Sequence, residues 1–469
     1  METKINSGCD YNRPRRPNPD TLIYLQSLSL NERQSHAEIE DYIKYKKTLQ
    51  NGDSNVDDVE EAEYPQGLMA AEAALDEILN EVASLAGDEF GSQCLETIVR
   101  ILVPYSSLAA RKLLYGITGY MVHLSTHRYG SHVVQTILQF ASQPTNIDDV
   151  MNEDICRFLK LTEEKTQDNL NHEIPPMKDL LCSISGELLS VTKDLAVHVC
   201  GSHVLRTLIC VLGGVEEILP LHLAMRSSSL NGYSAPRRGK MKTKKKRKKR
   251  NNSNESENTS NTDGDVCINN ASYNILKRIE KPRFDVKDKD ILDCFYMFYR
   301  ELSGVDLLDT NCEIYQMSHP GDLQELACNP SAGPLLIVLL KVLTARTSIK
   351  TVKTVEEKVK GTNEEKADFK LGIPHPDHQF ESGSQAEVLA KTFLSWDDKD
   401  KSGNDQKYAG DIIFGMSGER RGSHLLETLL KMANDEFYTA ICVAGSFFES
   451  VSIKEYVKHD GKFRPPPTS

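Results

Sequence analysis

The sequence has little of several residue types and patterns that mark other classes of protein. It contains one Trp, 14 Phe and 17 Tyr in 469 residues, which does not favour an aromatic-rich β-sandwich or barrel. The most apolar run, PLLIVLLKVL, is far shorter than the roughly 18 residues expected of a membrane-spanning helix. The N-terminal residues include no apolar core of a secretory signal, so we do not expect secretion.

The eleven cysteines are scattered and form no C-x-x-C pair. Cys94, Cys200 and Cys210 lie within apolar helical runs, where a free cysteine behaves as a small hydrophobic residue. This distribution favours a reduced, intracellular protein over a disulfide scaffold or a zinc module. His123 and His127 have a spacing compatible with zinc, but no third ligand accompanies them, so we expect partial burial instead.

No motif for catalysis or for binding a cofactor is present. The sequence has no Gly-rich phosphate loop, no G-x-S-x-G and no Cys/His pairing of the kind that activates a nucleophile. We therefore predict a protein that is not an enzyme, with no catalytic residue, no metal, no cofactor and no small-molecule substrate.

The charge is unevenly distributed. The chain has a formal net charge of −12, yet the run RRGKMKTKKKRKKR from Arg237 to Arg250 has 11 basic residues and no acid. The rest of the chain is therefore strongly acidic, and a surface for nucleic acid must be a local patch. The basic run is typical of a nuclear or nucleolar address and, as a second interpretation, of a non-specific RNA tether.

A short helical phrase occurs four times: EFGSQCLETIV, RYGSHVVQTIL, VCGSHVLRTLI and RRGSHLLETLL. Aligned on their glycines, the copies fall at Gly91, Gly130, Gly201 and Gly422, and the first two are 39 residues apart. That interval suits one solenoid unit of two or three helices, and an apolar helical segment precedes each copy. The longer intervals predict insertions and one degenerate unit that contains NPSAGPLLIVLL.

These observations predict an all-α solenoid with long disordered insertions. The chain divides into a disordered N-terminus (1–15), repeats one to three (16–225), a disordered basic and low-complexity insertion (226–288), a degenerate fourth repeat (289–349), a disordered insertion (350–385), a fifth repeat (386–460) and a tail (461–469). No polar capping repeat follows the fifth unit, which predicts that the chain is part of a longer product.

Each copy has an apolar face and an exposed polar face when it is drawn as a helix of 100° per residue. The residues expected in the core are Cys94, Leu95, Ile98, Val99, Val133, Val134, Ile137, Leu138, Val204, Leu205, Leu208, Ile209, Leu425, Leu426, Leu429 and Leu430. The residues expected on the surface are Gln93, Glu96, His132, Gln135, Gln139, His203, Arg206, His424 and Glu427. The serine after each glycine is expected to cap its helix, and the glycine to supply a tight turn.

Parallel copies of this helix would align their exposed residues into one ladder. A planar side chain, followed three residues later by Gln, Arg or Glu, suits stacking on a base and contacting its edge. Each position also has a plain interpretation as a solvated or locally hydrogen-bonded residue. Histidine at the same position in three copies favours binding of single-stranded RNA, because packing alone does not require it there.

The cores YGSHVVQ, CGSHVLR and RGSHLLE resemble Pumilio (PUF) repeats, whose base-contacting helix has the form G-x-x-V-V-Q. The order of motifs resembles the nucleolar protein nine branch of that family, also called Pumilio-like 23 in plants. The order comprises RPNPDTLIYLQSL, GSHVVQTIL, GSHVLRTLICVLGG, NPSAGPLLIVLL and RGSHLLETLL. The resemblance implies a right-handed superhelical solenoid of Pumilio-like repeats, similar to armadillo and HEAT arrays, with no catalytic centre.

The resemblance also implies roles for individual residues. Base stacking would fall to Gln93, His132, His203 and His424. Contacts to base edges would fall to Ser92 with Glu96, Ser131 with Gln135, Ser202 with Arg206, and Ser423 with Glu427. In PUF proteins a Ser/Glu pair is similar to a guanine reader, Ser/Arg to a cytosine reader and Ser/Gln to an adenine-type reader. The degenerate unit from Gly333 to Leu340 offers no polar residue of this kind.

The function implied is binding of single-stranded RNA in nucleolar pre-rRNA processing and small-subunit ribosome biogenesis. The expected partner is pre-rRNA of the small subunit, with pre-ribosomal proteins as further candidates and no membrane. The expected location is the nucleus and nucleolus. The alternative is a HEAT- or armadillo-like scaffold whose acidic surface binds a basic protein and does not contact bases.

Overall fold

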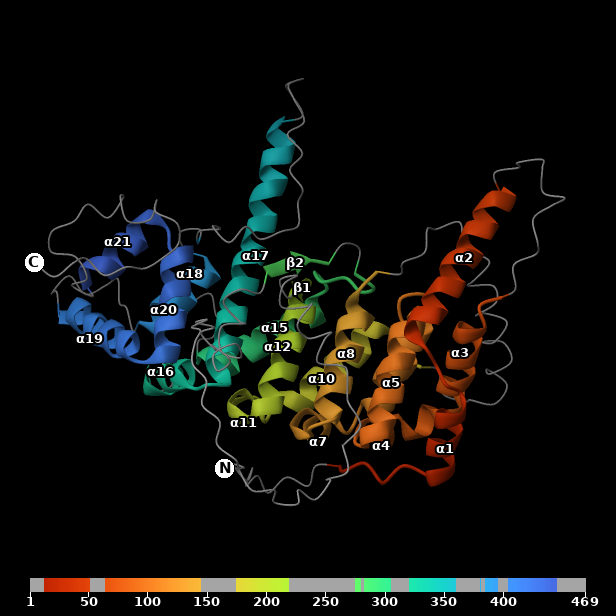
Figure 1. The fold of residues 1–469 in the computed structure, drawn as a ribbon. Coiled ribbons are helices and arrows are strands. Elements are labelled where there is room, and N and C mark those ends of the chain that lie inside the picture. Colours follow the sequence, from red (N-terminus) through yellow and green to blue (C-terminus); the bar gives the residue numbers. More distant parts are fainter. Residues whose placement is uncertain are drawn as a thin grey trace, which may run out of the picture.

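The computed structural model describes residues 12–50, 64–144, 174–218, 275–279, 282–304, 320–359, 380, 384–394 and 404–444. These residues form a row of helices that follows the chain from the N-terminal to the C-terminal side of the molecule (Figure 1). The basic run from Arg237 to Arg250 and the tail predicted for 461–469 lie outside the described residues. Within the part that is described, no helix has both the length and the apolar character needed to cross a membrane.

The repeating unit contains three helices, as the second repeat illustrates. Helix α6 (Ser107–Ile117) is followed by the short α7 (Met121–Thr126) and by α8 (Gly130–Ser142), which carries the repeated phrase. The sequence predicted one apolar helical segment before each copy, but here the chain breaks at Gly119, whose φ is +89°. That backbone conformation is easily adopted by glycine and cannot continue a right-handed helix.

The other repeats follow the same plan. The first comprises α3 (Gln66–Ile78), the 3-10 turn η2 (Leu79–Glu81) with α4 (Val82–Ala86), and α5 (Glu89–Leu102). The third comprises α10 (Met177–Leu189), α11 (Thr192–Val197) and α12 (Val199–Gly213). The fourth comprises α15 (Lys289–Ser303), α16 (Pro320–Cys328) and α17 (Ala332–Val359), and the fifth comprises α18 (Gln385–Phe393), α19 (Asn404–Gly418) and α20 (Arg420–Met432), followed by α21 (Asp435–Ala444).

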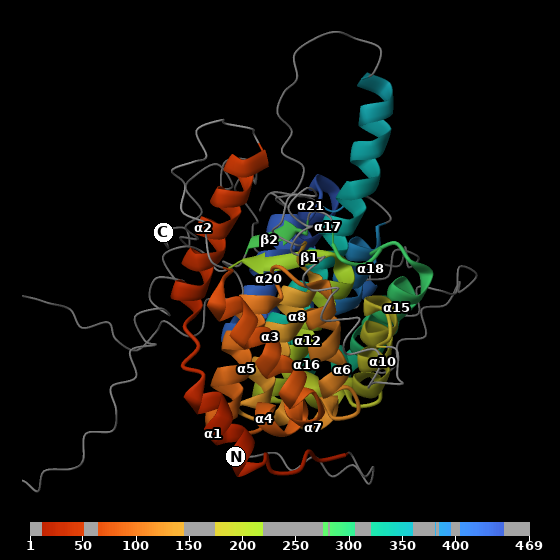
Figure 2. The same cartoon turned by 90° about the vertical axis from the view of Figure 1, so that its right-hand side faces the viewer.

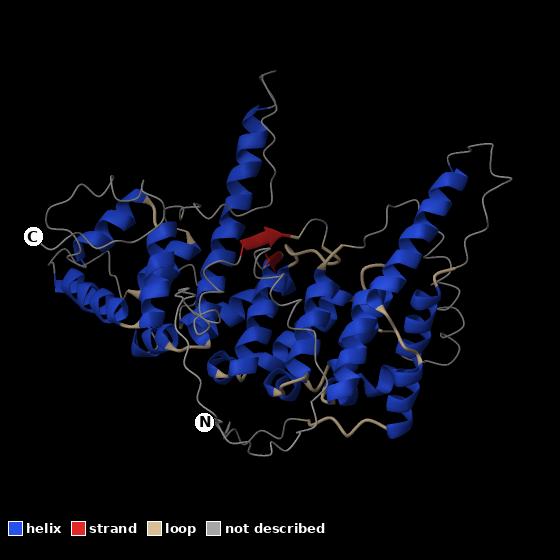
Figure 3. Ribbon diagram, in the orientation of Figure 1, coloured by secondary structure: helices blue, strands red, loops and turns tan. Residues whose placement is uncertain are grey.

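The third helices of the repeats pack against one another in chain order. Helix α5 contacts α8, α8 contacts α12, α12 contacts α17, and α17 contacts α20. We call these five the signature helices. Their shared direction is visible in Figures 1 and 3, where they stand side by side as one row of a helical solenoid. The predicted fold class, a solenoid of Pumilio-like helical repeats, is confirmed.

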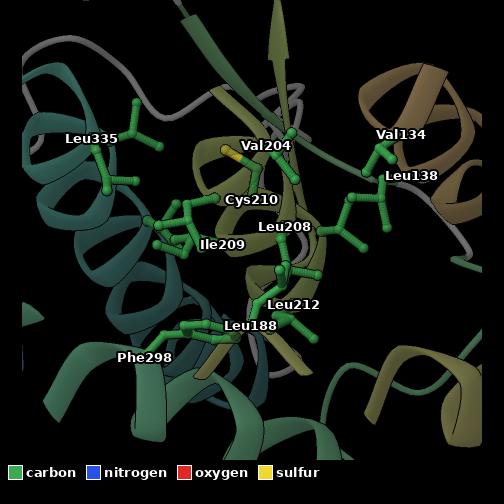
Figure 4. Packing of buried hydrophobic residues seen from close by; sticks show 14 of the residues in the cluster. Val134, Leu138, Leu188, Val204, Leu208, Ile209, Cys210, Leu212, Phe298 and Leu335 are labelled. Carbon is green, nitrogen blue, oxygen red and sulfur yellow. The ribbon is translucent and has the colours of Figure 1, made fainter. Parts of the chain in front are cut away.

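The apolar core runs continuously through this row. The four aliphatic residues predicted to be buried in α8 and the four in α12 are all fully buried. Figure 4 shows Val134 and Leu138 of α8 facing Val204 and Leu208 of α12, while Ile209 faces α17. In the first and fifth repeats, Cys94 and Leu430 are only partly buried, and the other predicted core residues are buried. Each central signature helix buries aliphatic side chains against the signature helices before and after it. This packing explains why the aliphatic positions recur in every copy of the phrase.

The repeated glycine permits a close approach between two helices of the same repeat. A Cβ atom built on Gly91, Gly130, Gly201, Gly333 or Gly422 would lie 2.7–2.9 Å from the carbonyl oxygen six residues earlier. None of these five has a positive φ, so the tight-turn role predicted for the glycine is wrong. The glycine is present because any side chain would push the signature helix away from the short helix before it.

One feature of the array is not helical. Strands β1 (Val215–Ile218) and β2 (Ile275–Arg278) pair antiparallel, with Val215 opposite Arg278 and Ile218 opposite Ile275. Strand β2 and residues 282–288 fall inside the range 226–288, which the sequence predicted to be a disordered insertion. The described part of this range thus includes one strand, and β2 contacts α17 (Figure 3).

Helix α17 is also longer than the sequence predicted. It runs to Val359, past the boundary at residue 350 where an insertion was expected. At the other end of the array, α1 (Pro19–Ser27) and α2 (Glu32–Gln50) cover the first repeat through contacts with α3 and α5. Both α17 and α2 project beyond the same side of the array (Figures 1 and 2).

We expect Gly130→Ala to lower the free energy of unfolding by about 1–3 kcal/mol, because the new methyl group overpacks against the Leu124 carbonyl oxygen. Gly186→Ala is the matched control, since Gly186 lies inside helix α10 and a methyl group there would have no neighbouring atom within 4 Å. That change should be neutral or stabilising by about 0.5–1 kcal/mol. Urea unfolding followed by circular dichroism measures both, and equal effects of the two substitutions would contradict the close-approach role.

Candidate nucleic-acid interface

The residues predicted to contact RNA lie in the first two turns of four signature helices. Gln93 on α5, His132 on α8 and His203 on α12 are exposed, and His424 on α20 is partly exposed. Because α5, α8 and α12 are packed side by side, three of these positions belong to adjacent helices. The position on α20 is separated from them by α17. We use the name ladder for these four residues together with the residues three positions further along each helix. The second set comprises Glu96, Gln135, Arg206 and Glu427.

Helix α17 interrupts the ladder. Near its start, Gly333, Leu335 and Leu336 are buried and Pro334 offers no hydrogen-bond donor. The sequence predicted that this unit would lack a polar contact residue, and the structure places only apolar side chains and glycine there. The fourth repeat therefore has glycine and apolar side chains at the positions where the other four repeats have polar groups.

The serine of each phrase is not the helix cap that the sequence predicted. Ser92, Ser131 and Ser202 are 2–5% exposed, and each donates its hydroxyl hydrogen to the carbonyl oxygen three residues earlier. Ser423 is partly exposed. Ser92, Ser131 and Ser202 lie inside their helices, past the N-cap position, so they come too late to accept from the first free N–H groups. Their hydroxyls are largely engaged with the backbone, which leaves the neighbouring side chains as the more accessible part of the ladder.

Residues other than the serines cap the signature helices, and comparison of the repeated phrases did not identify them. Asp88 accepts from the N–H groups of Phe90 and Gly91, at 3.0 and 2.8 Å. His198 Nδ1 accepts from those of Cys200 and Gly201, at 3.2 and 3.1 Å. His127 Nδ1 accepts from Gly130, and Asn329 accepts from Ser331 and Ala332. In the first three repeats the cap lies three residues before the glycine, and that offset was the signal available in the sequence.

The second residue of each ladder pair has a different electrostatic partner in each repeat. Glu96 accepts from Arg100 at 2.8 Å, and Glu427 accepts from Lys431 at 2.7 Å. Both partners are one turn further along the same helix and partly offset the repulsion that a carboxylate would exert on phosphate. These two positions can therefore accept hydrogen bonds from a base without standing as isolated negative charges.

The two central repeats present neutral and basic groups. Gln135 donates from Nε2 to the Ser131 carbonyl oxygen at 2.9 Å, which orients its amide along the helix. Arg206 lies 3.1 Å from His203 Nδ1 through its guanidinium, so the predicted stacking residue and the predicted edge residue of that repeat touch each other. Both side chains are planar and carry hydrogen-bonding groups, which suits stacking against a base.

His123 and His127 lie together at the start of α8. Their rings are stacked with centroids 5.9 Å apart and an angle of 27° between planes. Burial, followed by the nearby Arg13 guanidinium, lowers the pKa of both imidazoles below the ordinary value. In the described ranges no group of three or more His, Cys, Asp or Glu residues has the arrangement of a metal site. The pair therefore belongs to the helix start, as partial burial predicted.

The geometry defines a helical-repeat protein with one polar side-chain ladder on its signature helices. Residues 80–279, less than half of the chain, match the family described as the NOP9-like PUF repeat domain. The chain is 29% identical over 163 residues to Nucleolar protein 9 of Candida albicans (strain WO-1), which covers 34% of this chain and 22% of that protein. It is 25% identical over 176 residues to Nucleolar protein 9 of Komagataella phaffii, covering 38% and 25%.

The match with these curated relatives spans about a quarter of their length. Among solved structures, one described as APUM23-GGAAUUGACGG aligns with 92% of this chain and 59% of that chain, at 12% identity and a TM-score of 0.40.

The histidine caps predict a pH-dependent stability. Burial lowers the pKa of His198 below its ordinary 6.5, and the backbone N–H groups need its neutral form as acceptor. Because the unfolded chain binds the proton more readily, this contribution is present above pH 6.5 and is lost as pH falls through the lower folded-state pKa. We expect His198→Asp, which reproduces the cap at Asp88, to remove about 1 kcal/mol of the stability lost between pH 7 and pH 5.

Chemical unfolding at both pH values measures this difference, and His198→Ala is the control that lacks a cap at any pH. A wild-type protein and an aspartate variant with the same change in unfolding free energy between pH 7 and pH 5 would contradict the role of the histidine.

Proposed function

We propose that this protein binds single-stranded RNA along the ladder and acts in nucleolar pre-rRNA processing and small ribosomal subunit biogenesis. The observation that carries the proposal is the side-by-side arrangement of α5, α8 and α12, each exposing a planar or amide side chain two residues after its repeated glycine. Helical repeats that bind RNA use one repeat for one base and two or three side chains for each contact.

The chemistry of the ladder supports single strands over duplexes. Imidazole, amide and guanidinium groups stack on unpaired bases and form hydrogen bonds with their edges, which a duplex hides in its narrow major groove. In the second repeat His132 supplies the ring and Gln135 the amide. In the third, His203 and Arg206 already lie in contact and together offer a stacking surface.

The name of the relatives supports the cellular role. Both curated relatives are named Nucleolar protein 9, and the matched family is a NOP9-like PUF repeat domain. On that basis pre-rRNA of the small subunit is the proposed ligand, the nucleolus the proposed location, and pre-ribosomal proteins further proposed partners. The basic run from Arg237 to Arg250 supports a nuclear or nucleolar address. No catalytic activity is proposed.

We expect the double substitution His132→Ala with Gln135→Ala to weaken binding of a single-stranded RNA derived from small-subunit pre-rRNA by about tenfold or more. Loss of one stacked base costs about 1–3 kcal/mol, and 1.4 kcal/mol corresponds to a factor of ten. Thermal stability should change little, because His132 is exposed and Gln135 bonds only to its own helix. Fluorescence anisotropy measures the affinity.

Gln139→Ala is the matched control, since Gln139 is exposed on the same helix one turn beyond the ladder. Equal affinity of the double variant and the wild type would contradict base contact at the ladder. Absence of RNA binding by the wild type at moderate salt, together with binding of a basic protein, would favour the alternative of a protein-interaction scaffold.

A further inference from the structure

An extended N-terminal arm lies beneath the second repeat. Residues 12–18 have no helix or strand and pass under α7 toward α1, as both views of the ribbon show (Figures 1 and 2). Pro14 and Pro17 restrict the backbone of this segment to extended conformations. At its end, the Asn18 N–H donates to Glu81 of the first repeat at 3.2 Å. The arm is therefore held against the array at a defined place.

Arg13 on this arm lies close to the histidine pair. Residue 13 belongs to the arm segment that runs below α7 in Figures 1 and 2, and its guanidinium is a secondary cause, after burial, of the lowered pKa of His123 and His127. Arg128 is exposed at the same end of α8, and its guanidinium carbon lies 5.6 Å from the centre of the Tyr129 ring. The Tyr129 ring in turn lies 5.9 Å from the His127 ring. We call Arg13, His123, His127, Arg128 and Tyr129 the arm patch.

The arm patch is rich in hydrogen-bond donors. Since His127 is neutral and accepts from Gly130 at Nδ1, its ring proton is on Nε2, where it is a donor. The two guanidiniums supply further donors in a planar fork that matches phosphate oxygens. Burial lowers the proton affinity of the histidines, so the patch presents two full positive charges and neutral imidazole donors.

Two carboxylates accept from backbone N–H groups at the starts of α5 and α7. Glu187 of α10 accepts from the N–H groups of Gly119 and Met121 at 2.6 and 3.0 Å, at the start of α7. Asp88 caps α5 in the neighbouring repeat. No salt bridge to a carboxylate is formed by either arginine within the part of the chain that the structure describes. In a chain of net charge −12, such a local cluster of positive charge is a place where an anion can bind.

We propose that the arm patch binds the phosphodiester backbone of single-stranded RNA, with Arg13 and Arg128 each contacting a phosphate. Arg128 and Tyr129 directly precede Gly130, and the ladder residue His132 lies two residues after it. The arm patch is therefore continuous with the base-contacting positions of the second repeat. This assignment rests on the proposed function, and it adds a contact that is independent of base identity.

The test compares two double variants that lose the same charge. Arg13→Ala with Arg128→Ala removes the arm patch charges, while Arg33→Ala with Lys289→Ala removes two exposed charges from α2 and α15. We expect the first variant to bind RNA about tenfold more weakly, by the same factor for oligonucleotides of different sequence. The slope of log affinity against log salt should become shallower by about 0.7 for each phosphate that an arginine no longer neutralises. The control variant should match the wild type in slope.

Combining these measurements with the ladder variant separates the two proposals. An unchanged salt slope in the arm variant, with weaker binding by the ladder variant, overturns the arm patch alone. Weaker binding by the arm variant, with no effect of the ladder variant, supports the arm patch and overturns base contact. Absence of any RNA binding by the wild type overturns both. Unchanged RNA binding by the arm variant with loss of binding to labelled poly-glutamate assigns the patch to an acidic protein segment and overturns the proposal.

Discussion

The array depends on one steric constraint, the contact between each signature helix and the short helix before it. In all five repeats, the glycine lies where a Cβ atom would come within 2.7–2.9 Å of a carbonyl oxygen. This contact sets how deeply each signature helix sits in its repeat, and the next repeat packs on the result. The same close contact recurs in each repeat, so each signature helix meets the helix before it in the same way. The ladder is a consequence of that repeated contact, and so is the continuous core behind it.

Much of this arrangement could be predicted from the sequence, because packing in a repeat array is local and periodic. The aliphatic residues of the α8 and α12 phrases were expected to be buried, and they are. The three-helix unit was harder to predict from the sequence. The break at Gly119 depends on its positive φ, and the apolar residues around it gave no indication of a break. The pairing of β1 with β2 joins segments far apart along the chain, and no short-range pattern marks such a pair.

For the candidate interface, exposure could be predicted and the hydrogen bonds could not. A helical projection places Gln93, His132 and His203 outward, as the structure does. It does not reveal that the serines bond to the backbone or that capping is done by an aspartate, two histidines and an asparagine. These capping residues have similar hydrogen-bonding geometry but differ in residue type. A search for repeated sequence patterns therefore does not detect them. The proximity of Arg13 to the second repeat joins residues distant along the chain, and the pattern within a single phrase carries no sign of it.

The β-ribbon has a consequence for how this protein tolerates change. It begins at Gly214, whose φ of +71° ends α12, and its pairing brings Val215 opposite Arg278. Residues 219–274 thus enter and leave the array through this pair of strands. Closing a chain twice as long costs only about 0.6 kcal/mol more. This pair of strands is consequently a natural graft point, where a segment can be shortened, lengthened or exchanged for a foreign domain while the helical array keeps its spacing.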